Sequence, residues 1–78
     1  MGTQTVFHFT VDGEQLTTTE PLLTVAQILT LAGLDLNQHY LVEYAEHRIN
    51  YKGRNAHVVT MHDGQVFVSA HLGPVPVS

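Results

Sequence analysis

The chain has 78 residues, of which 44% are hydrophobic, 3 are Lys or Arg and 7 are Asp or Glu, so its formal net charge is −4 at pH 7. This length allows one small domain with a modest core, and the apolar fraction excludes a chain that is disordered throughout. Arg48, Lys52 and Arg54 are too few cations for the phosphate contacts that a nucleic-acid-binding protein makes.

Cysteine is absent from the sequence, which excludes disulfides, a thiolate nucleophile and a cysteine-based zinc site. The apolar runs are far shorter than the roughly 20 residues of a membrane span. A basic segment followed by an apolar run, the mark of a signal peptide, is also missing. We therefore expect a cytoplasmic protein without a membrane partner.

The first predicted elements form a β-hairpin. Residues 5–11 (TVFHFTV) alternate between apolar and polar side chains, which predicts a strand with one buried face. Asp12-Gly13 is a strong turn signal. Residues 16–20 (LTTTE) are polar and rich in β-branched side chains, which predicts a second, more exposed strand at an edge of the sheet.

Residues 24–33 (TVAQILTLAG) are predicted to form a helix. Thr24 and Gln27 have the spacing of a capping box, and Gly33 can adopt the left-handed conformation that ends a helix. The apolar side chains recur at helical spacing and make one broad stripe, formed by Val25, Ile28, Leu29, Leu31 and Ala32.

A connector and a third strand follow the helix. Residues 34–39 (LDLNQH) are predicted to be a connector whose two leucines pack the helix end against the core. Residues 40–45 (YLVEYA) predict the strand. We expect Glu43 to face water together with Leu41 and Ala45, and we expect Tyr40, Val42 and Tyr44 to face the helix.

The next stretch is the most irregular of the chain. Residues 46–56 are polar and contain at most a short strand near residues 48–51. Residues 57–61 (HVVTM) predict a strand or extended segment, and Asp63-Gly64 predicts a turn.

Residues 65–72 (QVFVSAHL) predict the last strand. Apolar side chains occur on both of its faces, which indicates a central position in the sheet. Residues 73–78 (GPVPVS) are predicted to be an exposed, extended tail, because proline cannot donate a hydrogen bond to a central strand.

The order of hairpin, helix, strand, irregular stretch and final strand favours an α+β fold of the β-grasp type. In this fold a mixed sheet of four to five strands packs on one helix, here over residues 4–72, with residues 73–78 as the tail. A simple antiparallel sheet with one helix is the alternative. The expected core contains Phe7, Phe9, Val11, Val25, Ile28, Leu29, Val42 and Val68.

The last strand offers a candidate partner-binding surface. If its smaller side chains face the helix, then Phe67 stands with Leu41 and His8 on the open face of the sheet, with His71 nearby. An exposed apolar patch rimmed by polar groups is typical of a protein-binding site. The alternative is that Phe67 belongs to the core, and the sequence leaves both possibilities open.

Catalytic signatures are weak in this chain, and we expect no enzyme activity. Ser69 lies within a strand without the flanking glycines of a nucleophile elbow. The histidines form no HxH or HExxH pattern, so we predict neither a metal site nor a cofactor, although a site that the fold assembles from His8 and His71 on neighbouring strands stays open. They are expected to be surface residues, at positions His8, His39, His47, His57, His62 and His71.

Several segments resemble the bacterial ubiquitin-like domains of the multiubiquitin type. They are VDGE (11–14), ILTLAGLD (28–35), HYLVE (39–43) and VFVSAHLGPVPVS (66–78). The resemblance implies a ubiquitin-like β-grasp fold. It also implies a role as a protein modifier in bacterial conjugation pathways, some of them tied to phage defence.

The resemblance further implies partner proteins and a processing site. The partners are ubiquitin-activating-like and conjugating-like enzymes and a JAB-type metalloprotease. The protease would cut between Gly73 and Pro74, and the carboxylate of Gly73 would then be activated and joined to a target amine. A second hypothesis is a non-covalent, self-assembling structural protein, an oligomer or filament held by the open sheet face and the tail.

Overall fold

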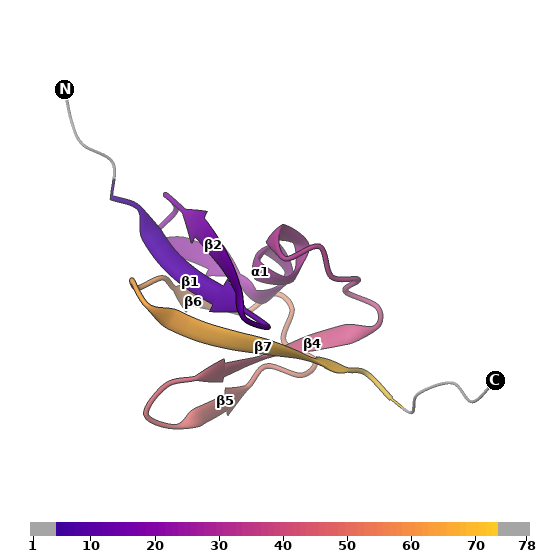
Figure 1. Ribbon diagram of the computed structural model, residues 1–78. Helices are drawn as coiled ribbons and strands as arrows, with labels where there is room; N and C mark the ends of the chain where they lie inside the picture. The colour runs from indigo at the N-terminus through magenta and orange to yellow at the C-terminus, as the bar shows by residue number, and fades with distance from the viewer. Residues whose placement is uncertain (1–4, 74–78) are drawn as a thin grey trace.

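The computed structural model describes residues 5–73. Over this range the chain is an α+β domain in which one helix packs beside a five-stranded sheet and a small two-stranded sheet (Figure 1). The elements in chain order are β1 (Phe7–Val11), β2 (Glu14–Thr18), β3 (Leu22–Thr24), α1 (Val25–Leu31), β4 (His39–Tyr44), β5 (Arg48–Asn50), β6 (Val58–Thr60) and β7 (Gln65–His71). In residues 5–73 no helix has the length and hydrophobicity needed to span a membrane.

The large sheet has the strand order β2-β1-β7-β4-β5, so β7 lies at its centre, as its sequence predicts. Strand β1 pairs antiparallel with β2 and parallel with β7, while β4 pairs antiparallel with β7 and β5. A parallel neighbour for β1 requires a crossover connection, which the chain makes by way of α1. This is the β-grasp arrangement that the sequence predicts, and the purely antiparallel alternative is wrong.

Helix α1 begins and ends where its sequence signals lie. Gln27 N donates to Thr24 Oγ1 over 3.1 Å, and Thr24 N donates to Gln27 Oε1 over 2.8 Å, which completes the capping box. Gly33 has φ +75°, a conformation that only glycine adopts without strain. Leu31 was expected to be buried but is 49% exposed. The side chains of α1 that are buried are those of Val25, Ile28 and Leu29.

The hydrophobic core lies between α1, one face of the large sheet and the small sheet. The rings of Phe9 and Phe67 meet edge to face, with centroids 6.0 Å apart. Partly buried Leu34 and Leu36 pack against the core from the connector, as predicted. The buried cluster consists of Phe9, Val11, Leu23, Val25, Ile28, Leu29, Leu41, Tyr51, Val59, Met61 and Phe67.

The orientation predicted for β4 is wrong. Leu41 is fully buried in the core cluster, and Glu43, at 8% exposure, accepts hydrogen bonds there. Because side chains alternate along a strand, Val42 and its paired residue Val68 point to the opposite, open face of the sheet. Val42 is nevertheless buried, at 1% exposure, as expected of a core residue, although it is not part of the main core cluster, whereas Val68 is only partly buried. The carboxylate of Glu43 was the misleading signal.

The two-stranded sheet was not expected from the sequence. Strands β3 and β6 pair antiparallel, with Leu23 opposite Val59, and each contributes one buried side chain to the core. Their sequences are three residues long, too short for a periodic pattern to show. The predicted strand at residues 57–61 does contain β6, but its partner comes from the segment between β2 and α1.

Candidate functional site

The C-terminal end of β7 carries the predicted processing position. Leu72 N donates to Gln38 O over 2.8 Å, which holds the chain against the connector before β4. Gly73 is exposed with φ +74°, and a Cβ placed on it would meet no described atom within 4 Å. The end of the described chain is thus open to solvent at one edge of the domain (Figure 1). Pro74, the other predicted processing residue, and the tail lie outside the described residues.

Two of the four predicted partner-binding residues are in the core. Phe67 and Leu41 both have 0% exposure, so they cannot form an accessible patch. Phe67 lies opposite Glu43 across β4 and β7, and next to Val11 across β1 and β7. These neighbours all point toward α1. The larger side chains of β7 therefore fill the core, and the open face receives the smaller ones.

The two predicted histidines are exposed but do not meet. His8 lies on β1 with its side chain on the open face, because it alternates with the buried Phe9. His71 is the last residue of β7 and shares the face of Phe67 and Ser69. Since β1 pairs with the first residues of β7, His8 lies at the opposite end of the sheet from His71. The predicted set of four residues is not a single site.

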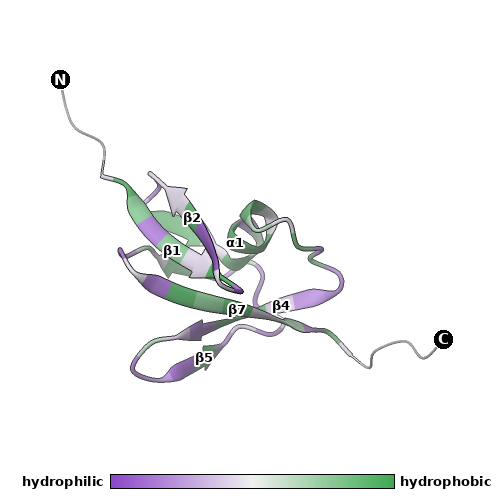
Figure 2. Cartoon of the chain, viewed as in Figure 1, coloured by the Kyte–Doolittle hydropathy of each residue, from purple (hydrophilic) through white to green (hydrophobic). Residues whose placement is uncertain are grey.

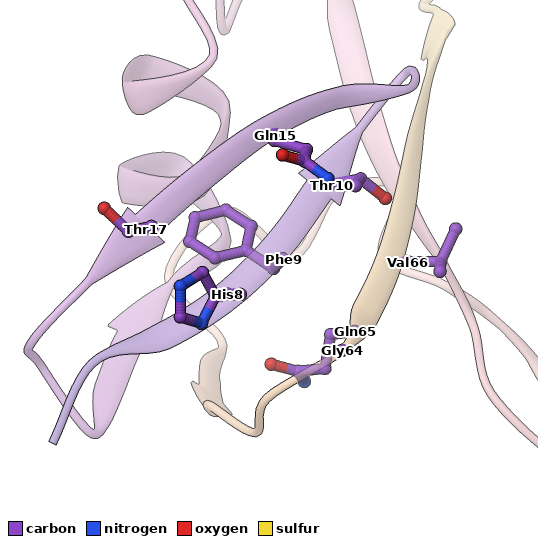
Figure 3. A pocket seen from close by; sticks show the side chains of 8 residues that line it. All are labelled: His8, Phe9, Thr10, Gln15, Thr17, Gly64, Gln65 and Val66. Carbon is purple, nitrogen blue, oxygen red and sulfur yellow. The ribbon is translucent and has the colours of Figure 1, made fainter.

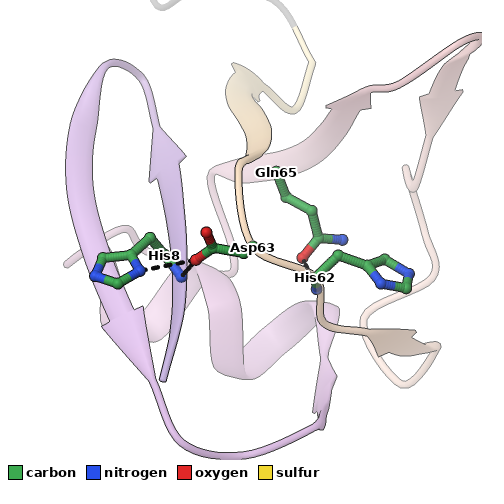
Figure 4. A network of polar contacts seen from close by, with 4 residues as sticks. All are labelled: His8, His62, Asp63 and Gln65. Carbon is green, nitrogen blue, oxygen red and sulfur yellow. Dashed lines mark hydrogen bonds and ion pairs between the residues drawn. The ribbon is translucent and has the colours of Figure 1, made fainter. Parts of the chain in front are cut away.

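The environment of His8 is set by Asp63 in the turn before β7 (Figure 4). Asp63 Oδ1 accepts from His8 N over 2.8 Å and lies 2.7 Å from His8 Nδ1. The backbone hydrogen bond from His8, followed by the bond from its side chain and its charge, lowers the pKa of Asp63. Gln65 Oε1 accepts from His62 N over 2.7 Å in the same turn. These bonds fix the turn and offer no arrangement for catalysis.

A hollow of about 320 Å³ lies beside His8 and crosses β2, β1 and the start of β7 (Figure 3). Its wall includes Thr10 and Thr17, which belong to the open face, and the backbone at Gly64. Its lining residues include no Asp, Glu, Lys or Arg. The full lining consists of His8, Phe9, Thr10, Gln15, Thr17, Gly64, Gln65 and Val66.

Two exposed apolar side chains lie on the open face of the sheet: Tyr44, which was expected to face the helix, and Val66, whose orientation the sequence left open. Val66 is 43% exposed and Tyr44 is 46% exposed, and the two lie opposite each other on β7 and β4. We call Tyr44, Val66 and Val68 the open-face patch. Figure 2 shows that β7, in the middle of the sheet, is largely hydrophobic in sequence.

Two cations border this patch. The guanidinium of Arg48 lies 5.6 Å from the centroid of the Tyr44 ring, and the ammonium of Lys52 lies 5.6 Å from that of Tyr40. These distances allow cation–π attraction. The alternation of β7 could have located the patch, had its larger side chains been assigned to the core.

Ser69 on β7 is hydrogen-bonded to Asp12 in the turn between β1 and β2. Its Oγ donates to Asp12 Oδ2 over 2.6 Å and its backbone N donates to Asp12 Oδ1 over 2.8 Å. Both bonds go to the carboxylate of one turn residue, so they tie the middle of β7 to the turn between β1 and β2. In residues 5–73, moreover, no group of three His, Cys, Asp or Glu side chains could hold a metal ion.

Comparison of the chain with protein-family models, with curated proteins and with solved structures gives no match.

Proposed function

We propose that the chain is a ubiquitin-like protein modifier that is joined to other proteins through Gly73. The observation that carries the proposal is the position of Gly73, exposed at the end of the central strand of a β-grasp sheet. The rigid sheet presents the end of β7 to a partner, and a residue without a side chain fits a narrow channel. The chain acts in this role as a substrate and not as a catalyst.

The proposed chemistry has three steps. A JAB-type metalloprotease hydrolyses the amide between Gly73 and Pro74, which leaves a carboxylate on Gly73. An activating-like enzyme joins this carboxylate to the α-phosphate of ATP and releases pyrophosphate. A cysteine thiolate of the activating-like enzyme then displaces AMP to form a thioester, a thiolate of the conjugating-like enzyme takes over the acyl group by thioester exchange, and a target amine displaces that thiolate to form an amide.

Intact mass spectrometry tests the first step. The full-length chain is incubated with the JAB-type protease of its source, and loss of residues 74–78 is the expected result. Gly73→Ala should slow the cut at least tenfold. The matched control is Gly64→Ala, because Gly64 is also exposed, with φ +86° and open space around it, but directly precedes β7 at the opposite end of that strand from Gly73. An unchanged mass of the wild-type chain would count against the proposal.

The second step has its own assay. A chain that ends at Gly73 should support ATP–pyrophosphate exchange with the activating-like enzyme, whereas the full-length chain should not. Equal exchange by both chains would contradict a requirement for processing.

A second candidate function is non-covalent self-assembly, and the open-face patch favours it. Exposed Val66 and Tyr44 lie side by side on a sheet face that α1 leaves uncovered. Light scattering should show association of the wild-type chain that Val66→Glu abolishes. Val58→Glu is the matched control, because Val58 is 51% exposed on β6, away from the patch. A monomeric wild-type chain at high concentration would exclude this function.

A further inference from the structure

We propose that His39 and His71 together bind a divalent transition-metal ion of the kind that imidazole prefers, with Zn²⁺ as the test ion. The site lies where β4 begins and β7 ends, two residues before the last described residue, Gly73 (Figure 1). This inference goes beyond the proposed modifier function and does not depend on it.

The first argument is the pairing of the two histidines across neighbouring strands. His39 lies opposite His71 in the antiparallel register of β4 and β7, and the ring centroids are 4.8 Å apart. The bond from Leu72 N to Gln38 O flanks this pair, which makes it a non-hydrogen-bonded pair. Side chains in such pairs are closer than in any other cross-strand position. Two imidazoles can therefore reach one ion without a change of backbone.

The second argument is the orientation of the His39 ring. Its Nδ1 lies 3.2 Å from the backbone oxygen of Asp35. A carbonyl oxygen can only accept a hydrogen bond, so Nδ1 carries the proton and the lone pair of Nε2 is left for an ion. Histidines that bind metals commonly donate their other ring nitrogen to a backbone carbonyl in this way.

The other histidines lack this combination. His8 is engaged by Asp63 at 2.7 Å, and the His57 ring lies against Tyr51, with centroids 5.3 Å apart. Among the described aromatic contacts, that between His39 and His71 is the one that joins two imidazoles. His71 is exposed and His39 is half-buried, so an ion can approach from solvent.

The two imidazole ligands determine which ions the site prefers and how readily a bound ion exchanges. The described residues supply two nitrogen ligands and no third one, so water completes the coordination. Imidazole favours Zn²⁺, Ni²⁺ and Cu²⁺ over the hard cations Mg²⁺ and Ca²⁺, which prefer oxygen. An ion held in this way remains exchangeable, unlike one in a closed four-ligand structural site.

Titration of the full-length, tag-free chain with Zn²⁺ tests the proposal. Imidazole resonances in NMR spectra should shift first and together for His39 and His71, and calorimetry should give one ion per chain. His39→Gln and His71→Gln should each weaken binding by about tenfold or more. Mg²⁺ at the same concentration should shift neither ring.

His47→Gln is the matched control, because His47 is exposed in the loop between β4 and β5 and should leave Zn²⁺ affinity unchanged. Thermal unfolding without metal verifies that all three variants fold. Equal affinity in His39→Gln and the wild type, or equal losses in all three variants, would overturn the proposal. The proposal would also be overturned if Zn²⁺ did not shift the imidazole resonances of His39 and His71 in the wild-type chain, a test that needs no variant.

Discussion

The hydroxyl of Tyr51 donates a hydrogen bond of 3.1 Å to Oε1 of Glu43, and both residues are buried inside the domain. Gln65 Nε2 lies 3.2 Å from the other carboxylate oxygen. Burial, and then the charge of Glu43, raise the pKa of Tyr51, so the phenol keeps its proton and remains a donor. No buried side-chain polar atom lacks a partner among the described residues. These bonds explain how a carboxylate lies beside the core.

Tyr51→Phe is expected to destabilise the domain by about 1–3 kcal/mol, because it removes the donor and leaves a buried carboxylate oxygen unpaired. Urea unfolding measures the change. The matched control is Tyr44→Phe, since the Tyr44 phenol is exposed on β4, and it should change stability by less than about 0.5 kcal/mol. Equal effects of the two substitutions would show that the Tyr51–Glu43 bond contributes nothing.

Thr24→Ala is expected to cost about 1 kcal/mol, because it removes the hydroxyl that accepts from Gln27 N at the start of α1. Thermal unfolding followed by circular dichroism measures the change in midpoint. Thr30→Ala serves as the control, because Thr30 is exposed on the same helix and makes no cap. A larger loss from Thr30→Ala would contradict the role of the cap.

Asp12→Ala is expected to destabilise the domain by about 1–3 kcal/mol. The substitution removes both acceptors of Ser69, and it places alanine at φ +54°, which is unfavourable for a residue with a Cβ. Asp12→Asn separates the two causes, because asparagine tolerates this conformation and keeps one acceptor. Its cost, measured by urea unfolding, should be clearly smaller, and equal costs would contradict the explanation.

Stability should fall as the pH drops below about 4, partly through Asp63. The pKa of Asp63 is lowered in the folded state, so its contribution is present above the unfolded pKa and is lost as the pH falls through the folded value. Unfolding free energies of the wild type and Asp63→Asn at pH 7 and pH 3 measure this contribution. The difference between the two chains should shrink at pH 3, and a constant difference would contradict it.

The sequence alone determined the order and type of most elements. The capping box, the Asp-Gly turns and the two-residue alternation of β1 are local signals, and each is formed by residues close together in the chain. The central position of β7 was also predicted, from the apolar side chains that occur on both of its faces.

Only the tertiary structure decided which face of β4 and β7 is buried, and therefore where a candidate site can lie. Glu43 enters the interior because Tyr51 and Gln65, which lie 8 and 22 residues further along the chain, donate to its two oxygens. That pairing turns Leu41 and Phe67 inward and leaves Val66 and Tyr44 exposed. The meeting of His39 and His71 likewise depends on the register between two strands. The burial of a charge and the contact of distant residues depend on the whole fold, and no local pattern encodes them.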